Sequence, residues 1–361
     1  SAGGAGGEGG SAGGGMGGAG GVGGGMGGAG GGVTGTALLL AGAANEMVGG
    51  EFHGVDPWMT ALIAGLTADP PSVALMGPSS GLGVIRASNG NQLQFATWSG
   101  GVWVPFGAVA PLITTRGRPA AVALSGAAHV IYQGENYKHY HGIYQGGAWN
   151  PMDAPVGPAG AQSFGPNPAA AAAIEATGEV LIAFPGNDNG IYAQSFVGGA
   201  WQNAIGFNQT NVMLTPAAAR LGAGGDALLV FISGSQVRWV SRTGGVWGVP
   251  ADIATALSLT EPALAPIAGG AVLAFRGTND KLYTSFFTSA GQSWSQPAAL
   301  GNFTTLKPPS LAAGILGADA ELAFVDAATG KAMHARLSNM AWSAPAAVGN
   351  GGSGVAIASV P

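Results

Sequence analysis

One pattern of apolar and polar positions recurs seven times along the chain. Each copy has an apolar run, a turn rich in Gly, Asn or Asp, an alternating run, and a short turn that delivers a Trp. Residues 180–201, VLIAFPGNDNGIYAQSFVGGAW, are one copy. The others occupy residues 37–58, 82–103, 128–149, 226–247, 273–294 and 321–342. Short apolar or alternating runs between turn residues are typical of β-strands, so each copy predicts a hairpin.

The tryptophans that end the copies set the period of the repeat. They are Trp58, Trp103, Trp149, Trp201, Trp247, Trp294 and Trp342, separated by 45, 46, 52, 46, 47 and 48 residues. A repeat of this length that is built from hairpins indicates the blades of a β-propeller. The sequence therefore predicts an all-β fold, a seven-bladed β-propeller over residues 33–361.

A second recurring piece opens with proline and is filled with small residues. Its six copies start at Pro70, Pro119, Pro168, Pro216, Pro262 and Pro308, and each precedes a hairpin. The first hairpin lacks such a piece, whereas residues 353–361, SGVAIASVP, have its character and precede no hairpin. Small side chains suit strands near a crowded axis, and proline is tolerated at a strand start. We expect the C-terminal segment to be the innermost strand of the first blade, which closes the ring.

Residues 1–32 form a separate segment with 21 glycines and one charged residue, Glu8. Such sequence is normally a flexible linker. Its non-glycine residues, however, follow a GGX pattern in three registers, and a period of three matches a polyproline-II type helix. We favour an extended rod whose bare glycine edges pack against neighbouring strands. The pattern resembles the polyglycine-II segments of glycine-rich insect antifreeze proteins and some phage tail proteins.

Apolar side chains on one edge of this tail predict a docking element. They are Met16, Ala19, Val22, Met26 and Ala29. An apolar edge of this kind can bind in a groove of a neighbouring subunit. Because docking of a tail into the next subunit does not close, it produces filaments.

Charge and cysteine content exclude several classes of function. Only 8% of residues are charged, the net charge is −5, and the basic residues form no cluster, which argues against nucleic acid as a partner. Apolar runs are too short to span a bilayer. The absence of cysteine removes disulfides and thiolate metal sites. The chain begins at Ser1 rather than Met, which suggests either a removed leader or a trimmed chain. A removed leader would agree with an extracellular protein, which is the location we expect.

The blade number, blade length and turn tryptophan resemble the seven-bladed propellers of sugar-binding bacterial lectins of the Photorhabdus fucose-lectin type. A more distant resemblance is to the sialidase family, whose repeated turn reads roughly Ser-x-Asp-x-Gly-x-x-Trp. Only residues 289–294, SAGQSW, approach that turn, and they lack the Asp. The lectin resemblance implies a carbohydrate-binding protein.

The repeated tryptophans have two interpretations. Each ring can stack on a sugar, or it can fill the wedge between neighbouring blades. The sequence favours the packing role, since that alone explains seven copies. Trp98 and Trp239 fall outside the repeat and are therefore the better candidates for sugar binding.

Other candidate chemistry is sparse. His139 and His141 share one face of a strand and could hold a metal, but no third ligand is adjacent, so a solvated outer strand is the preferred interpretation. No catalytic constellation or phosphate-binding loop is discernible, and we expect neither enzyme activity nor a cofactor.

Two functions remain open. The sequence favours an extracellular structural protein that assembles with copies of itself through its tail. The alternative is a secreted lectin that binds glycans, with the tail as a spacer.

Overall fold

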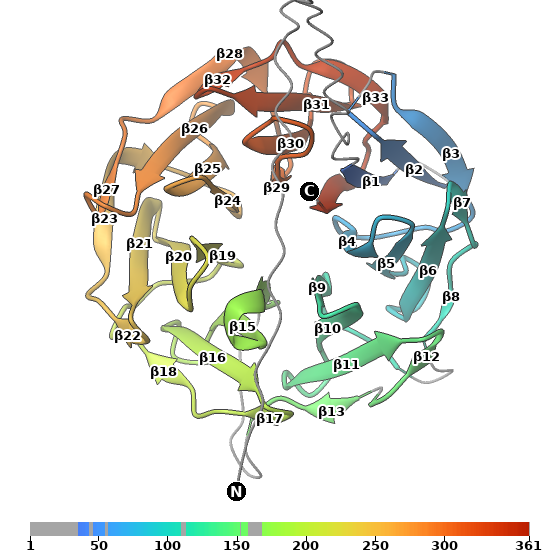
Figure 1. The fold of residues 1–361 in the computed structure, drawn as a ribbon, viewed down its shortest axis with the longest axis horizontal. Helices are drawn as coiled ribbons and strands as arrows, with labels where there is room; N and C mark the ends of the chain where they lie inside the picture. The colour runs from blue at the N-terminus through green and yellow to red at the C-terminus, as the bar shows by residue number, and fades with distance from the viewer. Residues whose placement is uncertain are drawn as a thin grey trace, which may run out of the picture. The chain divides into compact units, whose positions relative to one another are not determined.

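The computed structural model describes residues 35–42, 46–54, 57–109, 113–151, 153–157 and 168–360. Within these residues the chain forms seven antiparallel sheets around a central axis (Figure 1). The predicted all-β, seven-bladed propeller is confirmed. The tail, its docking residues and its boundary at residue 32 lie outside the described residues. In the described part, no helix is long and apolar enough to cross a membrane.

The innermost strand of each blade is rich in alanine, because little room is left near the axis. These strands are β34 (Gly354–Val360), β4 (Ser72–Gly77), β9 (Ala120–Leu124), β14 (Ala170–Ile174), β19 (Ala217–Leu221), β24 (Ala263–Ile267) and β29 (Ser310–Ala313). A single turn of 3-10 helix, η1 (Glu175–Thr177), follows β14.

The second and third strands of each blade pack against both neighbouring blades and form most of the core. The second strands are β1 (Thr36–Gly42), β5 (Ser80–Arg86), β10 (Ala127–Gln133), β15 (Glu179–Pro185), β20 (Asp226–Ser233), β25 (Gly270–Arg276) and β30 (Ala320–Val325). The third strands are β2 (Met47–Phe52), β6 (Leu93–Ser99), β11 (His139–Gln145), β16 (Ile191–Val197), β21 (Gln236–Thr243), β26 (Lys281–Thr288) and β31 (Lys331–Ser338). Burial on both faces explains why the second strands read as continuous apolar runs.

The outer strand is β3 (Met59–Ile63) in blade 1 and is split in the other blades. Its first part carries the repeat tryptophan: β7 (Val102–Trp103), β12 (Ala148–Trp149), β17 (Ala200–Trp201), β22 (Val246–Trp247), β27 (Ser293–Trp294) and β32 (Ala341–Trp342). The second part is β8 (Gly107–Ala108), β13 (Ala154–Pro155), β18 (Ile205–Gly206), β23 (Ala251–Leu257), β28 (Ala298–Thr304) and β33 (Ala346–Asn350).

The ring is closed by the two ends of the propeller sequence. Strand β34 pairs with β1 in an antiparallel register that runs from Thr36 opposite Val360 to Gly42 opposite Gly354. The predicted insertion of the C-terminal segment as the innermost strand of blade 1 is therefore confirmed.

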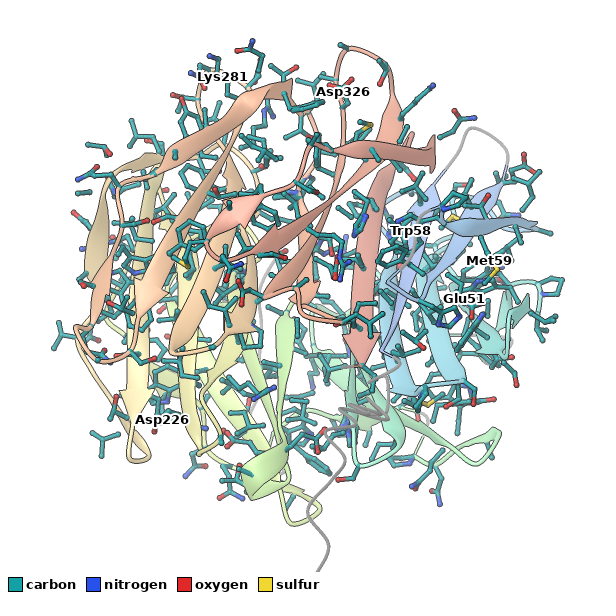
Figure 2. The ribbon with its side chains drawn as sticks, turned by 45° about the horizontal axis from the view of Figure 1, so that its top comes forward. Glu51, Trp58, Met59, Asp226, Lys281 and Asp326 are labelled. Carbon is teal, nitrogen blue, oxygen red and sulfur yellow. The ribbon has the colours of Figure 1, made fainter. Side chains whose placement is uncertain are left out.

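The two ends of the blades differ in composition. We call the end where the innermost strands begin the proline face, and it also carries the turns between second and third strands. Asn91, Asn189 and Asp280 occupy these turns with φ of 59°, 57° and 66°, as their turn chemistry predicts. Figure 2 shows Lys281 and Asp326 at this end and Asp226 at the opposite end. The opposite end, the tryptophan-turn face, carries the turns that precede the repeat tryptophans, with a glycine pair in blades 2 to 5.

Candidate functional site

Each repeat tryptophan lies in the seam between its own blade and the preceding one. The ring of Trp149 is centred 5.4 Å from Phe95 on β6, and that of Trp201 lies 5.3 Å from His141 on β11. The packing role that the sequence favoured for these rings is the one the structure has. Every seam contains such a tryptophan. The seams therefore differ mainly in the residue on the third strand of the preceding blade that contacts the tryptophan ring.

That third-strand position varies among the blades, and histidine is the one residue type that occurs twice. In blades 1 to 7 it is Gly49, Phe95, His141, Ala193, Trp239, Thr284 and His334. Trp239 therefore belongs to the repeat after all. It follows that only blade 5, among the described residues, presents a second tryptophan to its neighbour.

The seam between blades 5 and 6 combines two aromatic rings with a polar rim. Trp239 packs 5.0 Å from Phe287 and 6.5 Å from Trp294, with an interplanar angle of 70° between the two indoles. Both tryptophans are half-buried, and Trp294 Nε1 is buried without a hydrogen-bond partner among the described residues. We call this arrangement the 5/6 seam.

Hydroxyl and amide side chains from both blades form hydrogen bonds across this seam. Ser241 follows Trp239 on the same face of β21, and its Oγ donates to Gln292 Oε1 at 2.6 Å. Thr255 on β23 donates to Gln296 Oε1 at 3.1 Å. The rim thus offers uncharged donors and acceptors beside an aromatic surface.

Trp98, the other tryptophan singled out in the sequence, is placed differently. It is 2% exposed and packs with Met47, Ile63 and Ile85 in the core between blades 1 and 2. Its Nε1 has no hydrogen-bond partner among the described residues. A ring in this environment presents no face to a sugar.

The histidines of β11 are buried, which corrects the expected solvated strand. His139 and His141 are each 1% exposed, because a third strand is covered by the next blade. His141 Nε2 lies 2.9 Å from Nδ1 of His129 on β10, and the two rings stack. Among the described residues, no group of three His, Cys, Asp or Glu side chains is arranged to hold a metal.

Burial determines the protonation of this histidine pair. It lowers the pKa of His129 from 6.5 to about 4. Burial, together with the charge of His129, lowers the pKa of His141 to about 3. Both rings are therefore neutral near pH 7, and one N–H is shared between them.

We expect the pair to make the propeller sensitive to acid. Between pH 6.5 and 4.5 the unfolded chain binds protons at these histidines that the folded chain does not. The free energy of unfolding therefore decreases as the pH is lowered. The loss is about 2–3 kcal/mol per histidine at pH 4.5. Urea unfolding across this range should give a smaller loss for the His129→Gln, His141→Gln double variant. An equal loss in both proteins would contradict the assignment.

A buried ion pair joins blades 4 and 5. The guanidinium of Arg242 donates two hydrogen bonds, each of 2.7 Å, to the carboxylate of Glu179, and also bonds to the carbonyl of Gly225. Burial by itself would raise the pKa of Glu179, but the bonds from Arg242, Ser195 and Thr177 lower it below its usual value. The carboxylate is therefore ionised and fully paired. We interpret this ion pair as a structural link between the two blades.

A chain of polar contacts joins blades 7 and 1. Trp58 Nε1 donates to His334 Nδ1 at 3.1 Å, and His334 Nε2 lies 2.8 Å from Glu321 Oε2. Arg336 donates from Nε to Glu321 Oε1 at 3.2 Å. Glu321 is completely buried, so these contacts satisfy a carboxylate at the seam where the ring closes.

A cavity of about 540 Å³ lies on the propeller axis. The innermost strands line it with alanine and other small residues, and its described lining includes no aromatic ring. At the proline face, Arg118 Nη1 lies 3.3 Å from Glu261 Oε2, so a salt bridge joins blades 3 and 6. The cavity lacks a stacking surface for a sugar, unlike the 5/6 seam.

The propeller is similar in fold to several solved lectins. No protein-family model matches the chain, and no curated protein sequence matches it. The BP39L lectin from Burkholderia pseudomallei superposes with a TM-score of 0.71 at 14% identity, over 88% of this chain and 96% of the lectin. The fucose-specific lectin from Aleuria aurantia gives 0.55 at 13% identity over 79% and 96%. The protein AofleA from Arthrobotrys oligospora gives a TM-score of 0.56 at 12% identity, over 81% of this chain and 89% of that protein.

The Aleuria lectin is a six-bladed propeller, so this chain has one blade more.

The comparisons correct the function that the sequence favoured. A filament-forming structural protein was expected mainly from the glycine-rich tail, whereas the solved structures that share the propeller include fucose-specific lectins. The structural-protein hypothesis is therefore wrong, and the carbohydrate-binding alternative is the better supported. The propeller resembles lectin propellers in fold.

Proposed function

We propose that this protein is a carbohydrate-binding lectin, and that the 5/6 seam is one of its binding sites. The observation that carries the proposal is the pair of half-buried tryptophans, Trp239 and Trp294, beneath a rim of uncharged polar side chains. The likeness in fold to lectins supports the same function. A binding role needs no catalytic group, and an extracellular location stays a prediction from the sequence.

The chemistry of the seam matches that of a sugar. One side of a pyranose ring carries C–H groups, which pack on an indole and are removed from water. Its hydroxyl groups both donate and accept hydrogen bonds, as do the amides of Gln292 and Gln296 and the hydroxyls of Ser241 and Thr255. Because the rim is uncharged, we expect a neutral sugar. Fucosides are the first ligands to test, since three of the structures with a similar fold hold a fucose-containing ligand.

The proposal predicts that Trp239 and Gln292 matter for binding. Removal of a buried aromatic anchor costs about 2 kcal/mol, so Trp239→Leu should lower glycan affinity about 30-fold. Gln292→Ala alters only the exposed rim and should lower it about 5-fold. Titration calorimetry with a ligand first found on a glycan array measures both effects.

Trp98→Leu is the matched control, because it removes the same ring from a buried position. It should destabilise the fold but leave the affinity of the folded protein unchanged. Near-ultraviolet circular dichroism establishes that each variant is folded. If the unmodified protein binds no glycan on the array, the lectin proposal fails; if it binds and both seam variants bind equally well, the site lies elsewhere.

A further inference from the structure

The outer strand of blade 1 is built differently from those of the other blades. Strand β3 pairs with β2 over five consecutive residues, from Glu51 opposite Met59 to Met47 opposite Ile63, without a register shift. In blades 2 to 4 the outer strand consists of two pieces of two residues each. In blades 5 to 7 the longer piece, β23, β28 or β33, pairs with a register shift. Among the described residues, blade 1 is therefore the only blade whose outer strand is both continuous and regular.

The free edge of β3 is exposed and lacks the usual protection. Because β3 is the last strand of its sheet (Figure 1), alternate residues direct their N–H and C=O groups outward, where the described residues supply no partner strand. Met59 is 58% and Leu62 68% exposed, and Figure 2 shows Met59 at the outer surface of the blade. Natural proteins protect such edges with charged side chains, proline or bulges. Strand β3 has none of these.

The charge along this edge indicates which strand fits it. Residues 57–68 contain no charged side chain. The carboxylate of Glu51, opposite Met59 on β2, is bonded to His53 in the same blade. When a strand pairs with a copy of itself, its charges lie near charges of the same sign, which is destabilising. An uncharged edge avoids that repulsion, and it offers no ion pair to a charged partner. Self-pairing is therefore favoured over pairing with a charged strand.

We propose that β3 is a dimerisation edge, at which two copies of this chain join their β3 strands in an antiparallel pair. The four-stranded sheet of each copy then becomes half of a sheet twice its size. Because antiparallel pairing of identical strands has twofold symmetry, it uses both free edges and stops at two copies. The register that pairs all five residues places Ala61 opposite Ala61, and Thr60 opposite Leu62 of the second copy. Alanine, the smallest side chain of the strand, then lies on the symmetry axis.

Dimerisation would satisfy both the main chain and the side chains of this edge. The outward N–H and C=O groups gain partners, and Met59 and Leu62 lose contact with water. Because one strand from each copy provides most of the contact, the interface is small, and we expect a dimer of micromolar rather than nanomolar affinity. Blade 7 separates blade 1 from blades 5 and 6 in the ring (Figure 1), so this pairing does not involve the 5/6 seam.

Single cysteines in the full chain provide a direct test of the register, because the chain has no cysteine of its own. In the proposed register the two Ala61 Cα atoms lie about 4.5–5.5 Å apart, a distance that a disulfide spans. Ala61→Cys should therefore form a covalent dimer under mild oxidation, visible on a non-reducing gel. Thr60→Cys should cross-link about 10-fold less, because the two copies of residue 60 are offset along the strands by two residues. Equal cross-linking at both positions, or none at either, would overturn the proposal.

Charges placed on the symmetry axis provide an independent test in solution. Sedimentation velocity of the unmodified chain should show a dimer at high micromolar concentration. Ala61→Lys and Ala61→Glu should each weaken the dimer about 10-fold, since like charges meet at the axis. A mixture of the two variants should form a mixed dimer, which also shows that both are folded. Ala299→Lys, on the exposed part of β28 in blade 6, is the matched control and should dimerise as the unmodified protein does.

The remaining outcomes are equally decisive. An unmodified protein that stays monomeric at high micromolar concentration would overturn the proposal, and would be the result if β3 instead accepted a strand from a different protein. A dimer that both charged variants retain would place the interface elsewhere and overturn it as well. Neither measurement uses a sugar, so failure of the dimer leaves the proposed lectin function standing, and absence of sugar binding leaves the dimer standing.

Discussion

Removal of residues 353–361 is expected to abolish cooperative folding of the propeller. Strand β34 supplies the innermost strand of blade 1, and its Val355, Ala356 and Ile357 are 2%, 7% and 5% exposed. Burial of each larger side chain contributes about 1.5–3 kcal/mol, and each lost ladder bond about 0.5–1.5 kcal/mol. The sum approaches the 5–15 kcal/mol by which a typical domain is stable. The deletion also exposes the apolar edge of β1, which favours aggregation.

Thermal unfolding followed by circular dichroism, with light scattering, measures this effect. A peptide of residues 353–361 added in excess should restore a cooperative transition, because it can pair with β1 as the native segment does. Deletion of Pro361 alone is the matched control and should leave the transition unchanged. A truncated protein that melts cooperatively within a few degrees of the full chain would show that the closure contributes little.

Substitution of Arg242 by Met is expected to destabilise the protein strongly. The change leaves the carboxylate of Glu179, which is 5% exposed, without its bidentate partner. Loss of one member of a buried ion pair costs about 3–5 kcal/mol. The Glu179→Leu, Arg242→Met double variant should recover most of that loss, because it leaves no buried charge. Urea unfolding at pH 7 provides the measurement. The control is Arg220→Met, which removes an arginine whose hydrogen bond within the described residues is to the Gly222 carbonyl, and it should change the free energy of unfolding by less than about 0.5 kcal/mol.

The pH dependence of these variants provides a second check. In the unmodified protein the pKa of Glu179 is lowered, so the stability it contributes is present above the ordinary pKa of 4.5 and is lost as the pH falls below it. In Arg242→Met, burial is no longer opposed by the arginine and raises that pKa. The variant should therefore lose less stability relative to the unmodified protein at pH 5 than at pH 7. A constant difference would mean that Glu179 stays charged between pH 5 and pH 7 in the variant, so that removal of Arg242 does not raise its pKa into this range.

Several features of the site were open to sequence reasoning only in part. Trp239 was singled out because it falls outside the tryptophan spacing, yet the structure places it at a repeated third-strand position that faces the next blade. Trp98 was chosen on the same ground and is buried. Both strands alternate in the same way, so the sequence does not say which tryptophan faces an open seam.

The sequence by itself determined the fold of the propeller. Strand periodicity and turn chemistry act between residues close in the chain, so each blade is encoded locally, and the unmatched C-terminal segment identified the closing strand. Only the tertiary structure decided which side chains meet across the seams. Glu179 and Arg242, His129 and Phe196, and Trp239 and Trp294 come from different blades, and their pairing depends on side-chain directions and packing between sheets. A single sequence does not contain those distances, because they arise only when the ring of blades has closed.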